Sequence, residues 1–541
     1  MPIAAPAVSA IHLSRRASLF WVDALGRPPV LDVATEKGRL RRLSRSAAIP
    51  RFPPSWVDRS RLAQVPNFFI SRRKVSSFFP IGAAMAEDLQ RARYARRAVT
   101  PSRTPDVQWP WPLDAAEAAV ELLRALVRID TSNPPGRERE AINLLGRLLA
   151  GAGIEPTILA RNSERPNLLA RVRGRGQAPP LLLYGHVDVV PAAADGWTRD
   201  PFAGDVVDGQ VWGRGTLDMK GGLAMLVTAF ARAATQEDAP PGDLLLAVNS
   251  DEETGGHHGA RFLVDEHAGW FSGVRHALSE FGGYTHHVGG RRLYPIQVAQ
   301  KRRCVLRATV RGAGGHSATP LRGQTMARLA SVLRALDRRR LPAHVTPIVR
   351  AMVLSMAEGL PAWQRAGLRA LVRPRATDSV LRVAGPLAAD LDPLFRNTLA
   401  ATVVWAGEAR NVLPAAASLE LDGRLLPGQE PEDLAREARA ILPRDVTLEV
   451  LERDPPPVRR HPDLELMPLL TRVLREEDPA GHPFPLVTPG MTDARIYDAL
   501  GIQTYGFLPM RLPPGLMPRL LHAVDERVPV AALDAGARAL E

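Results

Sequence analysis

From residue 113 onward, short apolar runs of strand length alternate with amphipathic stretches of helix length. Apolar runs occupy residues 168–172, 181–184 and 244–248, and a helical pattern fills residues 222–234 between the last two. Strands that alternate with helices at this spacing are typical of an open sheet covered by helices. The sequence therefore predicts an α/β fold with an open, mixed and mostly parallel sheet. In such sheets, functional side chains gather at the carboxyl ends of the strands.

A second pattern begins near residue 297. Residues 297–310 and 416–425 alternate between apolar and polar side chains, as strands with one solvent-facing side do. Helical patterns follow at residues 325–338 and 432–441. This combination predicts a separate α+β domain that is inserted into the first domain.

The positive charge is concentrated at the start of the chain. The 541 residues include 70 Lys and Arg and 57 Asp and Glu, a formal net charge of +13. Residues 1–105 contain 19 basic and 6 acidic side chains, so the remaining residues are balanced with 51 of each. A protein that binds nucleic acid usually carries its positive charge on the folded surface, so we expect no nucleic-acid partner.

The first 110 residues also differ from the rest of the chain in composition and periodicity. They mix Pro, Arg and Ser with isolated aromatic residues and show no sustained period of 2 or 3.6 residues, so we expect this segment to be disordered. The predicted organisation has four segments: the basic N-terminal segment 1–110, the first part of the α/β domain 111–296, the inserted α+β domain 297–455, and the second part of the α/β domain 456–541.

Several classes of protein are excluded by composition. No stretch reaches the roughly 18 uninterrupted apolar residues of a membrane-spanning helix, so we expect no membrane span and no membrane partner. The apolar start of the chain has no basic residues before it, unlike a signal peptide. Cys304 is the only cysteine, which excludes an internal disulfide and a zinc site built from cysteines. These features predict a cytoplasmic protein.

The first candidate site follows the apolar run at 181–184. Residues 185–188 read Gly-His-Val-Asp, and alternation places His186 and Asp188 on the same side of an extended segment. The carboxylate can then select the tautomer of the imidazole, as it does for many metal-binding histidines. Taken alone, this pair is more often an ordinary loop histidine with a neighbouring aspartate.

Further carboxylates follow other predicted strands and turns. Asp218 lies at the tip of a glycine-rich turn that lacks the spacing of a phosphate-binding loop. Residues 251–253 read Asp-Glu-Glu after the apolar run at 244–248, and adjacent carboxylates repel one another unless a cation or a proton neutralises them. Glu280 follows a short predicted strand, and His522 lies far away in the sequence.

Together these residues supply two histidines and several carboxylates, each near a strand end or a turn. Such ligands suit a pair of divalent cations, for which zinc is the prediction and cobalt or manganese the alternatives. Two cations about 3.5–4 Å apart, bridged by a carboxylate and a water, would acidify the water and polarise a carbonyl group.

The five motifs occur in an order that resembles the M20 family of metallopeptidases and amidohydrolases. This family includes aminoacylases, glutamate carboxypeptidase, acetylornithine deacetylase and succinyl-diaminopimelate desuccinylase, and the resemblance covers about residues 113–541. Residues 212–218, 280–283 and 406–414 are most similar to the branch of carboxypeptidase S and N-acyl-amino-acid hydrolases. The resemblance implies a di-zinc peptidase-like catalytic domain with an inserted lid, which also serves for dimerisation.

The resemblance also implies a role for each residue. Asp188 would orient His186, and Glu252 would be the general acid and base. The implied metal ligands are His186 and Glu280 for one cation, Glu253 and His522 for the other, and Asp218 as the bridge between them.

The predicted lid domain carries further matches. Residues 314–320 are similar to a lid motif whose histidine, here His316, helps to stabilise the oxyanion, in dimers often from the neighbouring subunit. Asn411 and Arg424 resemble substrate contacts, and a guanidinium suits a substrate carboxylate because two parallel N–H groups can bind it. We therefore expect a homodimer through the lid.

Three functional hypotheses follow. The first is a hydrolase that cleaves a peptide or N-acyl amide bond next to a free carboxylate, with a small peptide or an N-acyl amino acid as substrate. The second is a deacylase specific for one small metabolite, of the acetylornithine or succinyl-diaminopimelate type. The third is a non-catalytic binding protein that uses the basic N-terminal segment.

Overall fold

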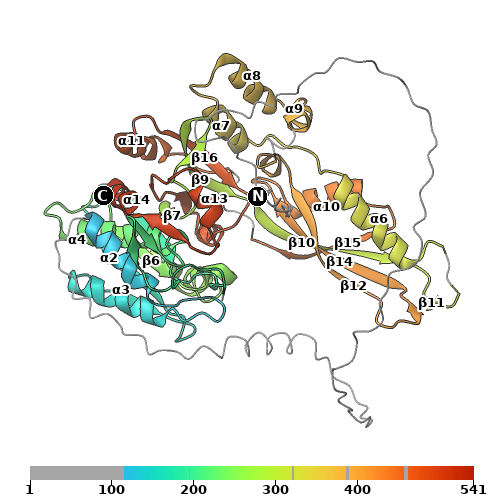
Figure 1. Ribbon diagram of the computed structural model, residues 1–541, viewed down its shortest axis with the longest axis horizontal. Coiled ribbons are helices and arrows are strands. Elements are labelled where there is room, and N and C mark those ends of the chain that lie inside the picture. Colours follow the sequence, from blue (N-terminus) through green and yellow to red (C-terminus); the bar gives the residue numbers. More distant parts are fainter. Residues whose placement is uncertain (1–114, 194, 320–321, 385–388, 456–457, 459–460) are drawn as a thin grey trace, which may run out of the picture. The chain divides into compact units, whose positions relative to one another are not determined.

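The computed structural model describes residues 115–541 except 194, 320–321, 385–388, 456–457 and 459–460 (Figure 1). The segment 1–110, for which the sequence predicts disorder, lies outside the described residues. Among the helices of the described part, none combines the length and the apolar character needed to cross a membrane.

The larger sheet has nine strands in the order β1-β2-β6-β3-β7-β17-β9-β16, with β8 paired to β9. Its four central strands, β6, β3, β7 and β17, are parallel, and antiparallel pairs lie on both sides of them. This arrangement confirms the predicted open, mixed sheet. The strands are β1 (Thr157–Leu159), β2 (Asn167–Val172), β3 (Leu181–His186), β6 (Leu244–Asn249), β7 (His276–Ser279), β8 (His286–Val288), β9 (Arg291–Gln300), β16 (His482–Thr488) and β17 (Gln503–Gly506).

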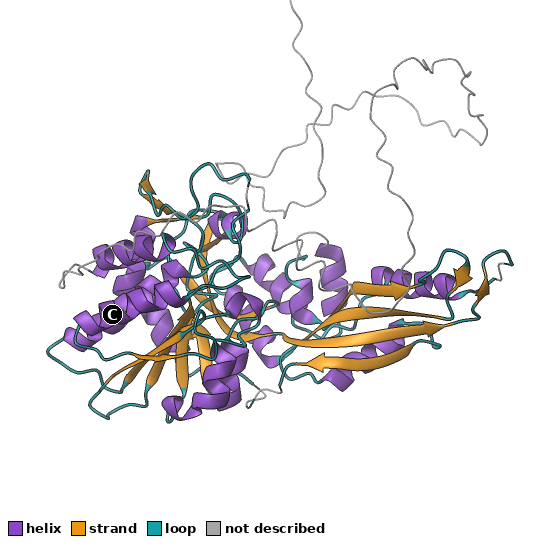
Figure 2. Ribbon diagram, turned by 90° about the horizontal axis from the view of Figure 1, so that it is seen from below, coloured by secondary structure: helices purple, strands orange, loops and turns teal. Residues whose placement is uncertain are grey.

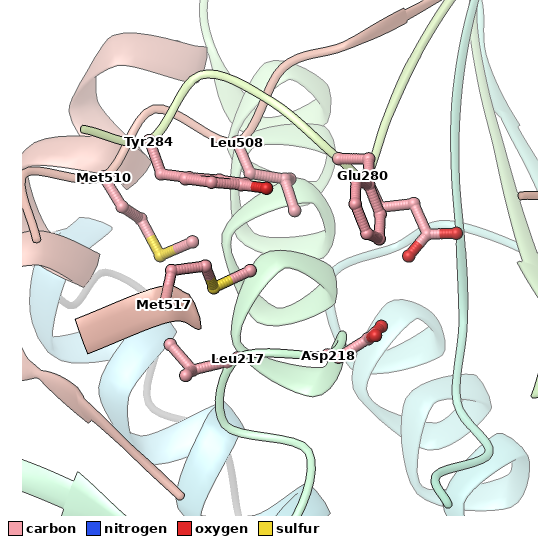
Figure 3. Close-up of a pocket in the computed structure, with 8 residues that line it drawn as sticks. Leu217, Asp218, Glu280, Tyr284, Leu508, Met510 and Met517 are labelled. Carbon is pink, nitrogen blue, oxygen red and sulfur yellow. The ribbon is translucent and has the colours of Figure 1, made fainter. Parts of the chain in front are cut away.

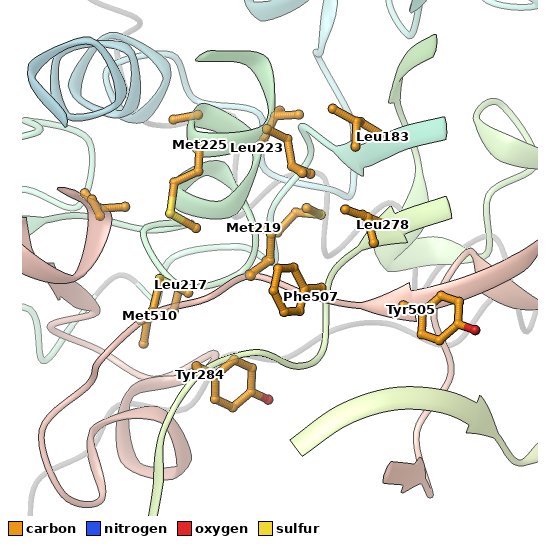
Figure 4. Close-up of a cluster of buried hydrophobic side chains, with 14 of the residues drawn as sticks. Leu183, Leu217, Met219, Leu223, Met225, Leu278, Tyr284, Tyr505, Phe507 and Met510 are labelled. Carbon is orange, nitrogen blue, oxygen red and sulfur yellow. The ribbon is translucent and has the colours of Figure 1, made fainter. Parts of the chain in front are cut away.

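Helices cover both faces of this sheet because its central strands are apolar on both sides. Leu183 of β3 faces one core with the helices α2, α3, α4 and α14, whereas Leu182 and Tyr184 face another with α5 and α12. Figure 4 shows Leu183 near Leu223 of α4 in the first of these cores. These helices are α2 (Ala115–Val127), α3 (Arg139–Gly151), α4 (Lys220–Thr235), α5 (Ala260–His267), α12 (Ala494–Tyr497) and α14 (Val530–Leu540).

The second sheet is antiparallel, with the order β12-β14-β10-β15. Figure 2 shows its long strands side by side. One of its faces packs on α6 and α10, and this leaves alternate residues of β14 buried, as the sequence predicts. We refer to this sheet with its helices as the lid. Its elements are β10 (Arg302–Arg311), β12 (Thr398–Ala406), β14 (Ala416–Leu425), β15 (Thr447–Arg453), α6 (Thr325–Arg338) and α10 (Pro431–Ile441).

The prediction of one continuous strand at 297–310 is wrong. The chain forms two strands there, with β9 ending in the larger sheet and β10 beginning in the lid. Lys301 lies between them, and its buried ammonium donates to the backbone oxygen of Arg396 at 2.8 Å. Residues 300–303 read Gln-Lys-Arg-Arg and interrupt the alternation, and the hydrogen-bonding partners of the backbone change there.

Smaller elements complete the two sheets. Between α6 and β12, the described residues include three α-helices and a turn of 3₁₀-helix, and the first α-helix packs on β16. Two small sheets lie in the connections: β11 with β13, and β18 with β5 and β4. The remaining bounds are α7 (Pro347–Met356), α8 (Ala362–Leu371), α9 (Thr377–Ala384), α11 (Met467–Glu477), α13 (Leu516–Leu520), β4 (Val206–Val207), β5 (Gln210–Trp212), β11 (Gly315–His316), β13 (Val412–Leu413) and β18 (Arg527–Pro529).

Candidate metal centre

Three neighbouring parallel strands of the larger sheet end at the candidate metal centre. His186 is the last residue of β3 and pairs in register with Asn249, the last residue of β6. Glu253 follows β6 within a single turn of 3₁₀-helix, and Glu280 directly follows β7. The carboxyl ends of parallel strands meet at one edge of the sheet, which is why these side chains converge.

Asp218 lies between the two histidines. Its Oδ1 atom is 3.1 Å from Nε2 of His186, and its Oδ2 atom is 3.0 Å from Nε2 of His522. The two oxygens of one carboxylate therefore face two different imidazoles, although 304 residues separate Asp218 from His522 in the chain. This is the arrangement that a carboxylate bridging two cations requires.

The remaining carboxylates extend the cluster on either side of Asp218. Oε2 of Glu280 lies 3.4 Å from Nε2 of His186, and Oε1 of Glu253 lies 3.5 Å from Nε2 of His522. Ligand atoms of His186, Asp218 and Glu253 all lie within 4.8 Å of one another, and the same holds for His186, Glu252 and Glu280. The five side chains that the resemblance implies as ligands thus lie together in the described part of the chain.

The electrostatics of the cluster favour bound positive charge. Burial raises the pKa of Glu280 to about 7, although His186 opposes this shift. The hydrogen bonds to Asp218 and Glu253 outweigh burial and raise the pKa of His522 to about 10. The carboxylates lie close together and share the positive charge of two histidines. Coordinated divalent cations would add positive charge to this cluster. The mixed nitrogen and oxygen donor set fits such cations.

Glu252 lies beside the implied ligands His186 and Glu280. Burial, followed by repulsion from Glu280, raises the pKa of its carboxyl well above the ordinary range. The same turn of 3₁₀-helix carries Glu252 and Glu253. Asp251, directly before them, adopts the left-handed conformation with a φ of 70°, which is uncommon for a non-glycine residue. Such conformations gather at functional sites.

Asp188 positions this turn as well as the imidazole. Its carboxylate accepts hydrogen bonds from the backbone N–H groups of Glu252 and Glu253, both at 3.1 Å, and from the amide of Asn133 at 2.8 Å. Nδ1 of His186 lies 2.9 Å from the backbone oxygen of Asp188 but 3.5 Å from its carboxylate. The sequence pattern indicated only the contact with the imidazole.

Sequence reasoning missed a buried ion pair that connects two of the loops in the centre. Glu526 accepts hydrogen bonds from the backbone N–H groups of Leu217 at 2.7 Å and Asp218 at 3.3 Å. Its other oxygen is 2.6 Å from Arg214, which also donates to the backbone oxygen of His522 at 3.4 Å. The pair thus joins the turn that carries Asp218 to the loop that carries His522. No local pattern reveals it, because its partners are 312 residues apart.

In the described part of the chain, the three predicted lid residues make no direct polar contact with this cluster. Within the described residues, no hydrogen bond or ion pair joins His316, Asn411 or Arg424 to the metal-centre side chains. His316 in β11 pairs with Val412, the residue after Asn411, so these two predicted residues are neighbours. Arg424 lies in β14, where it forms an ion pair with Asp422 at 3.0 Å.

The lid residues also lie at opposite ends of their sheet. Arg424 is near the end of β14, opposite Arg303 at the start of β10. Ala416, at the end of β14 nearest Asn411, is eight residues from Arg424. At about 3.3 Å per residue, the two residues are roughly 26 Å apart. Figure 1 shows β11 at one end of this sheet.

Comparisons with known proteins identify similar chains. Residues 182–541, two thirds of the chain, match the profile described as peptidase family M20/M25/M40. A succinyl-diaminopimelate desuccinylase of Cereibacter sphaeroides is 29% identical over 428 residues, which cover 77% of this chain and 95% of that protein. The N-fatty-acyl-amino acid synthase/hydrolase PM20D1 of Bos taurus is 28% identical over 379 residues, which cover 66% of this chain and 71% of that protein.

Among solved structures, a similar fold occurs in the M20 family metallo-carboxypeptidase Sso-CP2 from Sulfolobus solfataricus. Its TM-score is 0.53 at 16% sequence identity, and the match covers 78% of this chain and 97% of that one. At this identity the likeness concerns the fold, and it agrees with the open sheet and lid described above. The two curated relatives differ by only one percentage point in identity, so identity does not separate the functions in their names.

Proposed function

The chain belongs to peptidase family M20/M25/M40 and is a hydrolase of that family, and we propose that it is a two-metal amidohydrolase. The proposed reaction is hydrolysis of a peptide or N-acyl amide bond next to a free carboxylate. The observation that carries the proposal is the position of Asp218, whose two oxygens face His186 and His522.

In this proposal His186 and Glu280 would hold one cation, Glu253 and His522 the other, and Asp218 both. When bound, two divalent cations would polarise the substrate carbonyl and lower the pKa of the attacking water. Zinc is the proposed ion, and cobalt and manganese accept the same donors.

Glu252 moves the proton in the proposed mechanism. Its carboxylate accepts the proton of the attacking water and then donates it to the leaving nitrogen, so that water adds across the amide to give a carboxylate and an amine. Asp188 supports this step because it accepts hydrogen bonds from the backbone of Glu252 and Glu253. The turn that carries the proton-transfer group is thereby fixed relative to His186.

Arg424 and Asn411 are proposed to contact the substrate, with the guanidinium binding the free carboxylate. A second subunit is proposed to contribute His316, which lies with Asn411 at the other end of the lid sheet from Arg424. The exposed edge of this sheet supports a homodimer, because β12 presents Val403, Val404 and Trp405 at 41%, 55% and 49% exposure. The cytoplasmic location stays a prediction.

A small-metabolite deacylase is the second candidate function. The similarity to a desuccinylase over 95% of that relative's length favours it. It would use the same metal centre and the same proton transfer, and would differ in the acyl group that it accepts. The third hypothesis, a non-catalytic binding protein, rests on a basic segment outside the described residues and gains no support from the comparisons.

Removal of the metal ions is expected to abolish hydrolysis, and their return is expected to restore it. The test is to dialyse the full chain against a chelator, add back zinc, cobalt or manganese, and assay dipeptides, N-acyl amino acids and N-succinyl-diaminopimelate. A strong preference for the succinylated diamino acid would favour the deacylase. Unchanged activity in protein shown to be free of metal would contradict the proposal.

The homodimer hypothesis predicts that two inactive variants restore one another. If His316 acts in the neighbouring site, a hybrid of a His316→Ala subunit and a Glu252→Ala subunit has one intact site. Equal mixing with subunit exchange should therefore recover about one quarter of the wild-type activity, since half of the dimers are hybrids. Size-exclusion chromatography with light scattering checks that dimers form. No recovery in exchanged dimers would place His316 in its own subunit's site.

A further inference from the structure

Two arginines hold the end of the turn that carries Glu252. The turn ends at Gly255, whose N–H donates to the backbone oxygen of Glu252 at 3.0 Å. The backbone oxygen of Gly255 accepts hydrogen bonds from Nε of Arg261 at 3.2 Å and from Nη2 of Arg495 at 3.3 Å. A shift of either guanidinium would therefore displace the backbone next to the proposed proton-transfer group.

Both guanidinium groups face one carboxylate of the lid. Arg261 lies on α5 and Arg495 on α12, which pack on the larger sheet, whereas Asp454 directly follows β15 of the lid. Oδ1 of Asp454 is 3.9 Å from Nη2 of Arg261 and 3.9 Å from Nε of Arg495. One carboxylate of the lid thus lies opposite the two cations that bind the end of the turn.

Asp454 lies at the junction of the two sheets. Its N–H donates to the backbone oxygen of Arg303 at 3.0 Å, and its Oδ2 accepts from the N–H of Arg303 at 2.7 Å. Arg303 is the second residue of β10, directly after the change of sheet near Lys301, and it pairs in register with Arg424 of β14. The position of Asp454 therefore follows the lid strands that carry the proposed substrate contact.

Arg495 is connected to the same junction from the other sheet. Its Nη1 donates to the backbone oxygen of Thr492 at 2.9 Å. The N–H of Thr492 donates to Oε1 of Gln300, the last residue of β9, at 2.8 Å. The guanidinium of Arg495 thus lies between the end of β9, the end of the lid strand β15 and the turn of Glu252.

A buried donor of Arg495 points to an incomplete bond at this place. The Arg495 side chain is 10% exposed, and its Nε is buried without a hydrogen-bond partner among the described residues. Such groups are rare because an unpaired buried donor costs free energy. The distance from this Nε to Oδ1 of Asp454 is about 1 Å longer than an ordinary N–H···O hydrogen bond. A small movement of the lid at the junction would complete the bond.

We propose that Asp454 is a positioning residue for Glu252. It acts through Arg495 and Arg261, whose hydrogen bonds to Gly255 hold the turn in place for proton transfer. This inference rests on the proposed function and adds a role for the lid in the chemical step. The lid would then influence kcat as well as substrate binding, because it carries both Asp454 and Arg424.

The metal ligands lie outside this set of contacts. Within the described residues, no hydrogen bond or ion pair joins Asp454 or the two arginines to the five proposed ligands, of which Figure 3 shows Asp218 and Glu280. Coordination would fix the carboxylate of Glu253, whereas Glu252 is not a proposed ligand and depends on its backbone for position. Loss of Asp454 should therefore affect proton transfer and leave the metal content unchanged.

The Asp454→Asn variant tests this role. Asparagine keeps an oxygen acceptor for the N–H of Arg303 but removes the charge that faces the two guanidinium groups. With two ions bound, kcat should fall about tenfold with little change in KM, less than the roughly 10²-fold that a 1 Å misplacement can cost. Asp454→Glu restores the charge and should recover most of the lost activity.

Glu452→Gln is the matched control. Glu452 lies two residues before Asp454 on the same strand, is 61% exposed and forms an ion pair with Arg303 at 3.4 Å. The structure gives it no contact with Arg261 or Arg495 within the described residues. Its replacement also removes one negative charge near the junction, and it should leave kcat and KM at wild-type values.

A double-mutant cycle with Glu252→Gln separates a positioning role from a general loss of structure. If Asp454 acts through Glu252, Asp454→Asn should lower kcat in the wild-type background and leave the residual kcat of Glu252→Gln nearly unchanged. The residual rate is measured at saturating substrate and high enzyme concentration. Arg261→Gln should follow the same pattern, and it provides a second variant should Asp454→Asn not fold.

The outcomes separate this inference from the proposed function. An equal fall of kcat in both backgrounds, a change confined to KM, or wild-type kinetics in folded Asp454→Asn would overturn the positioning role and leave the metal mechanism intact. Failure of the metal-loaded wild-type enzyme to hydrolyse any amide, or wild-type turnover in Glu252→Gln, would contradict the proposed function itself.

Discussion

Replacement of Glu252 by glutamine is expected to lower kcat by roughly 10²–10⁴-fold, the usual contribution of a positioned general acid and base. Glutamine keeps the shape of the side chain but cannot accept the proton of the attacking water. The turn itself should persist, because the hydrogen bond from Glu252 to Asp188 comes from the backbone. Steady-state kinetics at saturating substrate, together with metal analysis and circular dichroism, measures the effect.

Metal content is the discriminating readout for Glu252→Gln. Because Glu252 is assigned no ligand role, the variant should retain two ions per chain and the wild-type circular dichroism spectrum. Glu266→Gln is a suitable control, since Glu266 is an exposed carboxylate that forms an ion pair with Arg161 and has no contact with the cluster. Wild-type turnover in Glu252→Gln would show that another group transfers the proton. Loss of one ion would instead make Glu252 a ligand.

Replacement of Asp218 by asparagine is expected to reduce the bound metal from two ions per chain to at most one and to remove hydrolysis below detection. A neutral amide has one oxygen acceptor, so it cannot face both His186 and His522 with oxygens as the carboxylate does. Stabilisation by added metal should fall as well, because a ligand that binds only the folded state stabilises it by RT ln(1 + L/Kd), where L is the free ligand concentration, and this quantity decreases as Kd rises. Metal analysis and thermal unfolding with and without added zinc measure these effects.

Asp478→Asn provides the control for a buried carboxylate outside the centre. Asp478 accepts hydrogen bonds from Arg292 and Tyr294 and is as buried as Asp218, so its replacement should lower stability without a change in metal content. If Asp218→Asn still binds two ions with wild-type affinity, the bridging role is wrong. If both variants lose metal equally, general destabilisation explains the result.

Much of the larger sheet follows from local sequence. The runs at 181–184 and 244–248 are apolar at every position, which predicts strands buried on both faces, and β3 and β6 have this environment. The segment around Lys301 shows where this reasoning ends. The side-chain pattern on either side of residues 300–303 carries no information about which strand each backbone group will pair with.

The sequence likewise predicts some features of the candidate metal centre and not others. Residue types limit the chemistry: imidazoles and carboxylates that follow predicted strands indicate a site for hard-to-borderline cations. The pattern at 185–188 also indicates the local contact between His186 and Asp188, because that contact spans two residues. It does not indicate that the carboxylate of Asp188 accepts hydrogen bonds from the turn at 252–253, since those donors are more than 60 residues away.

The order of strand-forming runs, the ligand chemistry and the local turns can therefore be read from the amino acids, because each depends on side chains within a few positions of one another. Packing alone brings the loop of His522 to Asp218, through the ion pair of Arg214 with Glu526. These features depend on distances between residues hundreds of positions apart. Such distances are set by the burial of whole strands and helices, which no short stretch of sequence specifies.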